Sequence, residues 1–194
     1  VSPINLYKIF IFKKTRHFTW FPILYHDIPY NTKYFFYNFY WEIKLFLSQY
    51  TYKVDNKGRI SVPADFRISV NTKFFNGIIA FRSYKFKAIE CLDFEKMKKI
   101  ADSLDDLDFF SESKNDITTS ILSDSYKLPF DSEGRICLPN ELLKFANIKN
   151  QATFVGRGSS FQIWNPNSFK DYLQKARNNI KKKKLSLVIK NTNN

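Results

Sequence analysis

Hydrophobic and polar residues alternate over a short stretch in the first half of the chain, at residues 59–62. Ile60 and Val62 fall on one side of a predicted strand, whereas Arg59 and Ser61 fall on the other side. Pro63 follows, and we expect it at the first position of a helix, where its missing N–H costs nothing. The pattern therefore predicts a tight hairpin that leads into a strand and then into a helix.

The same pattern returns 76 positions later along the chain. The phrase DNKGRISVPADF covers residues 55–66, and DSEGRICLPNEL covers residues 131–142. In the second copy Ile136 and Leu138 form the apolar side of the strand, and Pro139 opens the helix. Chance rarely reproduces a match of this length. We therefore interpret the body of the protein as a duplicated module.

A glycine and an aspartate shape the turn in each copy. Gly58 and Gly134 can adopt a positive φ angle, which tight turns require. Asp55 and Asp131 can accept hydrogen bonds from backbone N–H groups across the turn. Each aspartate also lies four residues before an arginine, with which it can form an ion pair that holds the turn.

Each half of the chain then shows a helical pattern near its end. Asp93 and Asn165 are the expected helix caps. The apolar stripes, which we interpret as core or subunit contacts, are Phe94, Met97, Ile100, Ala101 and Leu104 in the first helix and Phe169, Tyr172, Leu173 and Ala176 in the second. Each half thus predicts a strand, a turn, a second strand, a short helix, a strand pair and a closing helix.

These patterns predict an α+β fold in which the two halves share one core with pseudo-twofold symmetry, because a unit of about 65 to 75 residues is marginal alone. They divide the chain into five parts. The parts are an aromatic-rich extension at 1–44, a first repeat at 45–104, an acidic connector at 105–125, a second repeat at 126–176 and a basic tail at 177–194.

The extension differs from the rest in composition, since 15 of its 44 residues are aromatic and none is glycine. AT-rich DNA yields such a composition when translated, so we hypothesise an upstream start site. The alternative is a membrane-associating extension. Charged residues interrupt the segment too often for a transmembrane helix, and no small-residue cleavage site marks a signal peptide.

The net charge of +13 is unevenly distributed. The extension carries +4 and residues 174–194 carry +7, whereas residues 45–89 carry +6, residues 90–133 carry −7 and residues 134–173 carry +3. The first repeat is therefore the electropositive one and suits a polyanion such as DNA. A solvated charged face is the alternative. The basic candidates are Lys53, Lys57, Arg59, Arg67, Lys73, Arg82, Lys85 and Lys87.

Arg59 is the strongest candidate for a DNA contact, because a guanidinium can bridge phosphates or pair with guanine edges, and a β-ribbon is narrow enough to enter the major groove. Asp55 can orient it. Arg135 has the same local setting, but Glu133 and Glu141 make the second copy less attractive to phosphate, so a structural or subunit-contact role is equally open.

Three features of the sequence occur together: the two Asp-x-x-x-Arg motifs, the segment FLSQY at 46–50 and the segment TFVGRGSSFQIWNP at 153–166. In these features the chain resembles the MraZ family of bacterial transcription regulators, which is related to the AbrB-type DNA-binding fold. The resemblance spans roughly residues 45–175. Leu45 stands where relatives have an initiator methionine. The region 105–125 departs from the pattern, since it is rich in Asp and Ser where relatives carry arginines and a more apolar helix.

This resemblance implies a cytoplasmic, nucleoid-associated regulator without a cofactor. Such a protein binds short direct repeats in double-stranded DNA upstream of a cell-division and cell-wall gene cluster, and it assembles into rings of many subunits. A ring would place several copies of the DNA-binding turn side by side, so that several weak DNA contacts could act together. The alternative is a noncatalytic AbrB-type interaction module, either antitoxin-like or RNA-binding.

An enzyme is disfavoured because no histidine follows residue 44, which excludes His-based catalytic and metal sites from the body. Cys91 and Cys137 are too few for a zinc cluster, and we expect both to be small buried thiols in strands. GRGS at 156–159 lacks the Walker pattern. For Lys181–Lys184 we favour a disordered solubilising tail over additional phosphate contacts.

Overall fold

The structure is a computed structural model, and it describes residues 44–70, 74–108 and 111–183. The predicted extension lies outside the described residues except for Lys44. Lys73 and the end of the basic tail, residues 184–194, also lie outside them. The disorder predicted for Lys181–Lys184 is wrong for Lys181–Lys183, because these residues form the end of the helix Pro166–Lys183. Within the described ranges, no helix is long and apolar enough to cross a membrane.

The order of helices and strands matches the predicted order in both halves. The first half contains β1 (Gln49–Lys53), β2 (Arg59–Ser61), α2 (Ala64–Val70), β3 (Gly77–Arg82), β4 (Ala88–Leu92) and α3 (Phe94–Asp105). The second half contains β5 (Tyr126–Pro129), β6 (Arg135–Cys137), α5 (Asn140–Phe145), β7 (Gln151–Gly156), β8 (Phe161–Trp164) and α6 (Pro166–Lys183). Between them lie α4 (Glu112–Ile117) and the π-helix η2 (Thr118–Leu122).

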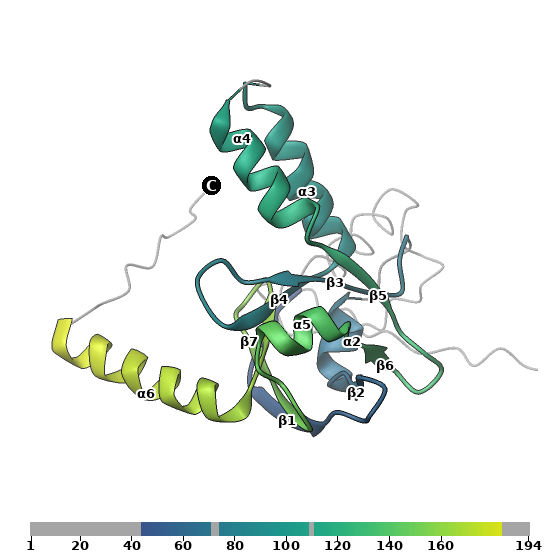
Figure 1. Ribbon diagram of the computed structural model, residues 1–194, viewed down its shortest axis with the longest axis vertical. Helices are drawn as coiled ribbons and strands as arrows, with labels where there is room; N and C mark the ends of the chain where they lie inside the picture. The colour runs from purple at the N-terminus through teal and green to yellow at the C-terminus, as the bar shows by residue number, and fades with distance from the viewer. Residues whose placement is uncertain (1–43, 71–73, 109–110, 184–194) are drawn as a thin grey trace, which may run out of the picture. The chain divides into compact units, whose positions relative to one another are not determined.

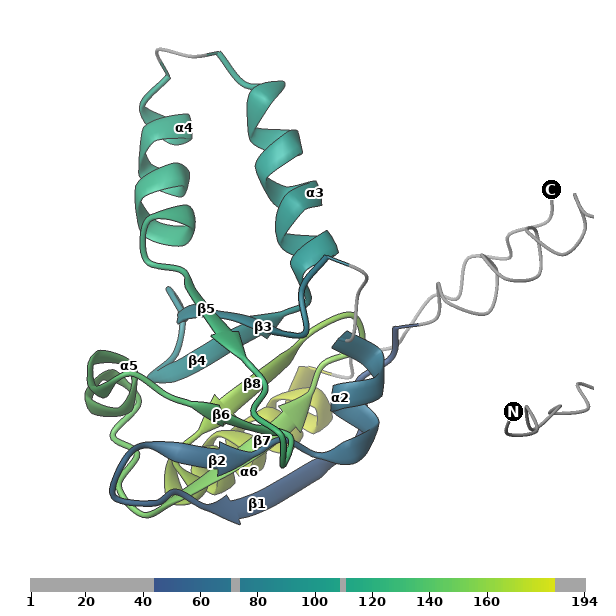
Figure 2. The ribbon, with the colours of Figure 1, turned by 90° about the vertical axis from the view of Figure 1, so that its right-hand side faces the viewer.

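The strands form one six-stranded antiparallel sheet in the order β1-β7-β8-β4-β3-β5, and a separate two-stranded ribbon of β2 and β6 (Figures 1 and 2). Strands of the two halves are therefore interleaved in the sheet: β1 of the first half is followed by β7 and β8 of the second, then by β4 and β3 of the first, and then by β5 of the second. The central pair, β4 and β8, joins one strand from each half. The α+β class predicted from the sequence is confirmed.

The predicted local hairpins are wrong in one respect. The turns form, but β1 does not pair with β2: β1 pairs with β7, and β2 pairs with β6. The reason is burial, because Ile60 and Ile136 oppose each other in the ribbon and each retains 1% exposure. A hairpin within one copy would lack the apolar partner that the other copy supplies.

Aromatic rings fill the centre of the main core. The Phe66 ring from α2 lies 5.3 Å from Phe46 and 5.0 Å from Phe161, centroid to centroid, and Phe154 also borders it at 6.4 Å. All four side chains are fully buried. This cluster joins α2 of the first half to β7 and β8 of the second half.

The caps of the closing helices are confirmed. Asp93 accepts a hydrogen bond from the Lys96 N–H at 2.9 Å, and Asn165 Oδ1 accepts from the N–H groups of Asn167 at 2.9 Å and Ser168 at 3.2 Å. The prolines lie one position earlier than predicted. Pro63 directly precedes α2, and Pro139 caps α5 with an extended ψ of 146°.

Two elements extend away from the sheet. The pair of α3 and α4 stands on one side of it, as both ribbon views show (Figures 1 and 2). In these views α6 leaves the sheet in a different direction. Only Leu104 of α3 is buried, and no residue of α4 or η2 is.

Candidate nucleic-acid interface

The β2–β6 ribbon brings the two repeated phrases together face to face. Arg59 pairs with Cys137, and Ser61 pairs with Arg135, on either side of the central isoleucine pair. The backbone pairing continues at both ends, because the Val62 N–H donates to the Gly134 carbonyl at 3.2 Å and the Leu138 N–H donates to the Gly58 carbonyl at 2.9 Å.

The isoleucines face the core, so the four remaining side chains of the ribbon share its outer face. Arg59 and Arg135 occupy diagonal positions on that face, about 7–8 Å apart at the backbone in such a ladder. A turn lies beside each arginine. The ribbon therefore presents two guanidinium groups on one narrow surface.

The first turn, residues 55–59, is organised by a single carboxylate. Asp55 Oδ1 accepts hydrogen bonds from the N–H groups of Lys57 and Arg59, both at 2.8 Å, and Oδ2 accepts from Arg59 Nε at 2.6 Å. These contacts, led by the Arg59 backbone N–H, lower the pKa of Asp55. Gly58 has a φ of 76°, as the sequence predicts.

Of the three nitrogens of the Arg59 guanidinium, Asp55 accepts a hydrogen bond only from Nε. Among the described residues, no acceptor is bonded to the two terminal amino groups of this guanidinium, and the side chain is 40% exposed. The carboxylate thus orients the arginine while its fork of N–H donors remains available. This is the geometry that pairing with phosphate or guanine needs.

The second turn, residues 131–135, repeats this arrangement with one difference. Asp131 accepts from the N–H groups of Glu133 and Arg135, both at 2.9 Å, and from Arg135 Nε at 2.7 Å. The Arg135 backbone N–H is the main cause of the lowered pKa of Asp131. In addition, Glu133 Oε2 lies 2.7 Å from Arg135 Nη1. Arg135 is therefore shared by two carboxylates.

Arg67 contacts the second turn rather than standing beside the first. Its Nη1 donates to the carbonyls of Glu133 at 3.3 Å and Gly134 at 3.4 Å. The side chain lies so close to Gly134 that a Cβ there would fall 2.6 Å from the Arg67 guanidinium carbon. This geometry favours a turn-supporting role for Arg67 over the DNA contact expected from the sequence.

Leu143 has the corresponding place in the second copy, 76 positions after Arg67. Its Cδ1 would lie 3.4 Å from a Cβ on Gly58. One turn is thus supported by an arginine and the other by a leucine. The sequence could not reveal this difference, because each support crosses from one copy to the other.

Other basic candidates of the first repeat have partners elsewhere. Arg82 Nε donates to Asp124 at 2.9 and 2.8 Å, which raises the pKa of Arg82. Lys87 Nζ lies 4.6 Å from the Phe145 ring centroid. Lys85 Nζ lies 5.7 Å from the Phe86 ring centroid. These residues belong to β3 and the loop after it, not to the ribbon.

Lys57 and Lys53 lie nearer to the ribbon. Lys57 is in the first turn, where its carbonyl accepts from the Cys137 thiol at 3.2 Å. Lys53 ends β1, opposite Gln151, and is exposed. Both lysines are therefore positioned to add positive charge at the margin of the arginine face.

The two cysteines differ from each other. Cys91 is buried in β4, as predicted, and burial raises the pKa of its thiol. The predicted burial of Cys137 is wrong, because this residue lies on the outer face of the ribbon opposite Arg59. Among the described residues, no group of three His, Cys, Asp or Glu side chains could hold a metal ion.

Comparison with known proteins identifies relatives for most of the chain. A family model described as "MraZ protein, putative antitoxin-like" matches residues 121–189. A Pelagibacter ubique protein named transcriptional regulator MraZ is 44% identical over 143 residues, which cover 74% of this chain and 92% of the relative. Proteins of the same name from Rickettsia canadensis and Rickettsia rickettsii are each 40% identical over 145 residues, covering 75% of this chain and 97% of the relative.

Proposed function

Since this chain belongs to the MraZ family, we propose that it is a DNA-binding transcriptional regulator whose β2–β6 ribbon enters the major groove of double-stranded DNA. One observation carries the proposal most directly. The guanidinium of Arg59 is held by Asp55 through Nε–H alone, on an exposed face, and its terminal N–H groups are bonded to no other described residue. A guanidinium oriented in this way loses little entropy when it binds.

The dimensions of the ribbon support the same proposal. The major groove, about 12 Å wide, admits a two-stranded β-ribbon. Arg59 and Arg135 are diagonal neighbours on one face of the ribbon, so both can contact the same groove. Lys53, Lys57 and the basic balance of residues 45–89 add attraction to phosphates that does not depend on sequence.

The two arginines have unequal roles in this proposal. Glu133 and Asp131 both neutralise Arg135, whereas Asp55 alone faces Arg59. Arg59 is therefore the principal base or phosphate contact, and Arg135 contributes less. Asp55 and Asp131 orient the arginines, and Gly58 and Gly134 allow the turns.

The internal duplication of the chain and the association of copies are also part of the proposed function. We propose that the body is a duplicated module with pseudo-twofold symmetry about the ribbon and the β4–β8 pair, with repeats at 45–104 and 126–176 and with α6 continuing past the second repeat to Lys183. Two observations support it: Ile60 and Ile136, which are 76 residues apart, pair with each other, and the strand order places β1 and β5, β7 and β3, and β8 and β4 at equivalent distances from the two ends of the sheet. We propose further that copies assemble into a ring, so that several ribbons bind short direct repeats together.

The resemblance to the family also suggests where the protein acts. We propose a cytoplasmic, nucleoid-associated regulator of a cell-division and cell-wall gene cluster, with no cofactor. The relatives are named transcriptional regulators, which favours regulation over catalysis. The word antitoxin in the family description supports a second candidate, a noncatalytic module that binds a protein partner.

Fluorescence anisotropy of the full chain tests the proposal. The probes are DNA from upstream of its gene and a scrambled sequence, each over a salt series. We expect selective binding, and Arg59→Ala should cost about 1–3 kcal/mol on the cognate DNA, as loss of a bidentate base contact does. Lys99→Ala removes the same charge from the exposed surface of α3 and serves as the matched control.

Two results would contradict the regulator proposal. One is equal affinity of the wild type for both DNAs, and the other is an unchanged affinity of a folded Arg59→Ala variant. In either case the ribbon arginines would be structural, and the antitoxin-like alternative would be tested by capture of a protein partner on the same variants.

A further inference from the structure

The outer face of the β2–β6 ribbon carries one small side chain opposite each arginine. Cys137 is the ladder partner of Arg59, and Ser61 is the ladder partner of Arg135. Side chains at such opposed positions lie on the same face, with their Cβ atoms about 4.5–5.5 Å apart. Both small residues are exposed. A base edge can therefore approach an arginine and its small partner together.

The two small residues have the same place in the repeated phrase but differ in their chemistry. The thiol of Cys137 donates its one hydrogen to the Lys57 carbonyl at 3.2 Å. Its sulfur therefore offers DNA no donor and presents a polarisable, largely apolar surface. The hydroxyl of Ser61 is bonded to no described residue, and a hydroxyl can both donate and accept. The first position suits an apolar contact and the second a polar one.

Base pairs differ in what they offer to a sulfur and to a hydroxyl. In the major groove thymine presents its 5-methyl group, on which small apolar side chains pack, whereas a serine hydroxyl finds a partner on several bases. Successive base pairs lie about 3.4 Å apart, so a residue about 5 Å from Arg59 lies over a neighbouring base pair. When Arg59 pairs with a guanine, Cys137 therefore faces the base pair beside it.

We propose that Cys137 is a specificity-determining residue whose sulfur packs on the 5-methyl group of a thymine beside the base pair that Arg59 contacts. Ser61 is permissive, because its hydroxyl adapts to several bases. The Arg135–Ser61 row discriminates less for a second reason, since Glu133 Oε2 also engages Arg135 Nη1 at 2.7 Å. The inference rests on the proposed DNA binding and names the base that the ribbon selects.

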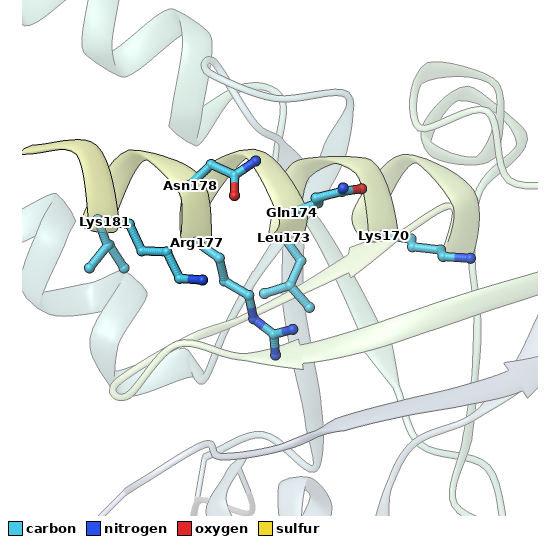
Figure 3. Close-up of a pocket in the computed structure, with 7 residues that line it drawn as sticks. Lys170, Leu173, Gln174, Arg177, Asn178 and Lys181 are labelled. Carbon is cyan, nitrogen blue, oxygen red and sulfur yellow. The ribbon is translucent and has the colours of Figure 1, made fainter.

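Basic side chains elsewhere provide a control for charge alone. Helix α6 extends away from the ribbon (Figures 1 and 2). A groove of about 510 Å³ on this helix is lined by α6 residues alone, among them Lys170, Arg177 and Lys181 (Figure 3). Loss of the charge at Arg177 can weaken binding to any DNA, but it should leave the preference for one base unchanged.

Replacement of a thymine by deoxyuridine removes only the methyl group and leaves every hydrogen-bonding group in place. The test is fluorescence anisotropy of the full chain, in reducing buffer, on DNA from upstream of its gene with each thymine replaced in turn. We expect at least one replacement to weaken wild-type binding about three- to fourfold, the effect of one buried methyl group. Cys137→Ser should bind the two DNAs equally, since it keeps the donor to the Lys57 carbonyl but lacks the sulfur.

Ser61→Ala and Arg177→Ala are the matched controls, and both should keep the wild-type dependence on that methyl group. The inference is overturned if no replacement weakens wild-type binding, or if Cys137→Ser responds to the same replacement as strongly as wild type. It is overturned equally if Ser61→Ala abolishes the response. The wild-type scan needs no variant, so it decides the matter even if Cys137→Ser does not fold.

Failure of this inference differs from failure of the proposed function. Wild-type binding that is selective for the upstream DNA and sensitive to Arg59→Ala, yet unaffected by every replacement, overturns the role of Cys137 alone. Equal binding of wild type to the upstream and the scrambled DNA overturns both.

Discussion

Ile60 lies directly opposite Ile136 in the β2–β6 ribbon, and the two residues have the same place in the repeated phrase. Both are almost fully buried. Each copy of the phrase therefore completes its strand only by pairing with the other copy. The arginines that flank these isoleucines depend on that shared contact for their common orientation.

Ile136→Ala should lower the free energy of unfolding by about 2–5 kcal/mol, because it leaves a cavity beneath both turns. Ile68→Ala is the control, since this residue of α2 is 74% exposed and its truncation should change the stability by at most about 0.5 kcal/mol. Urea unfolding followed by circular dichroism measures both variants. A loss below about 1 kcal/mol for Ile136→Ala would show that the ribbon does not depend on this pair.

Gly58→Ala should destabilise the fold more than Gly158→Ala. Both glycines have a positive φ, 76° and 78°, so alanine is strained at either position. At Gly58, however, the new Cβ would lie 2.6 Å from the Leu138 carbonyl oxygen, whereas nothing lies within 4 Å of a Cβ at Gly158. We expect about 1 kcal/mol at Gly158 from strain alone and a larger loss at Gly58. Equal melting temperatures of the two variants would contradict this.

Glu133→Gln should strengthen DNA binding about two- to fivefold, because it removes the carboxylate that engages Arg135 Nη1 and one repulsion from the phosphates. Anisotropy on the upstream DNA measures the change, and the gain should shrink at high salt. Glu112→Gln, on α4, makes the same charge change away from the ribbon and should have little effect. A weaker Glu133→Gln complex would mean that Glu133 is needed to hold the turn.

Arg67→Ala should lower the melting temperature and weaken DNA binding less than Arg59→Ala does. Its guanidinium supports the second turn through the carbonyls of Glu133 and Gly134. Arg67→Lys retains the positive charge but loses the forked donors, so it should be destabilised as well. If Arg67→Ala is as stable as wild type and loses affinity as strongly as Arg59→Ala, Arg67 is a direct DNA contact.

Acid should destabilise the two turns. The folded-state pKa of Asp55 and that of Asp131 lie below the ordinary value of 3.8, so their ionised forms stabilise the fold above that pH. This contribution is lost as the pH falls from about 3.8 through the lowered folded-state pKa. Asp55→Asn with Asp131→Asn should therefore be less stable than wild type at pH 7, and the difference should narrow towards pH 3.

Denaturant unfolding between pH 3 and pH 7 measures this dependence. Asp116→Asn, on exposed α4, is the comparison variant and should follow the wild-type curve. A stability difference between the double variant and wild type that does not change with pH would mean that the turns do not depend on the carboxylate charge.

Local structure followed closely from the sequence. The positive φ of Gly58 and Gly134, the Asp–Arg pairs and the caps at Asp93 and Asn165 all involve residues within four positions of one another. Such contacts depend on turn and helix chemistry, which the order of residues specifies directly. The periodicity of apolar residues likewise predicted the order of helices and strands, because burial selects one face of each element.

Contacts between the copies were decided only by the tertiary structure. The sequence alone determined that two similar turns, strands and helices exist, and that each turn carries an arginine beside an aspartate. It did not determine that β2 pairs with β6, that Arg67 supports the second turn, or that Cys137 is exposed. These features depend on which copy buries which apolar side chain, and pairing between distant segments leaves no local pattern along the chain.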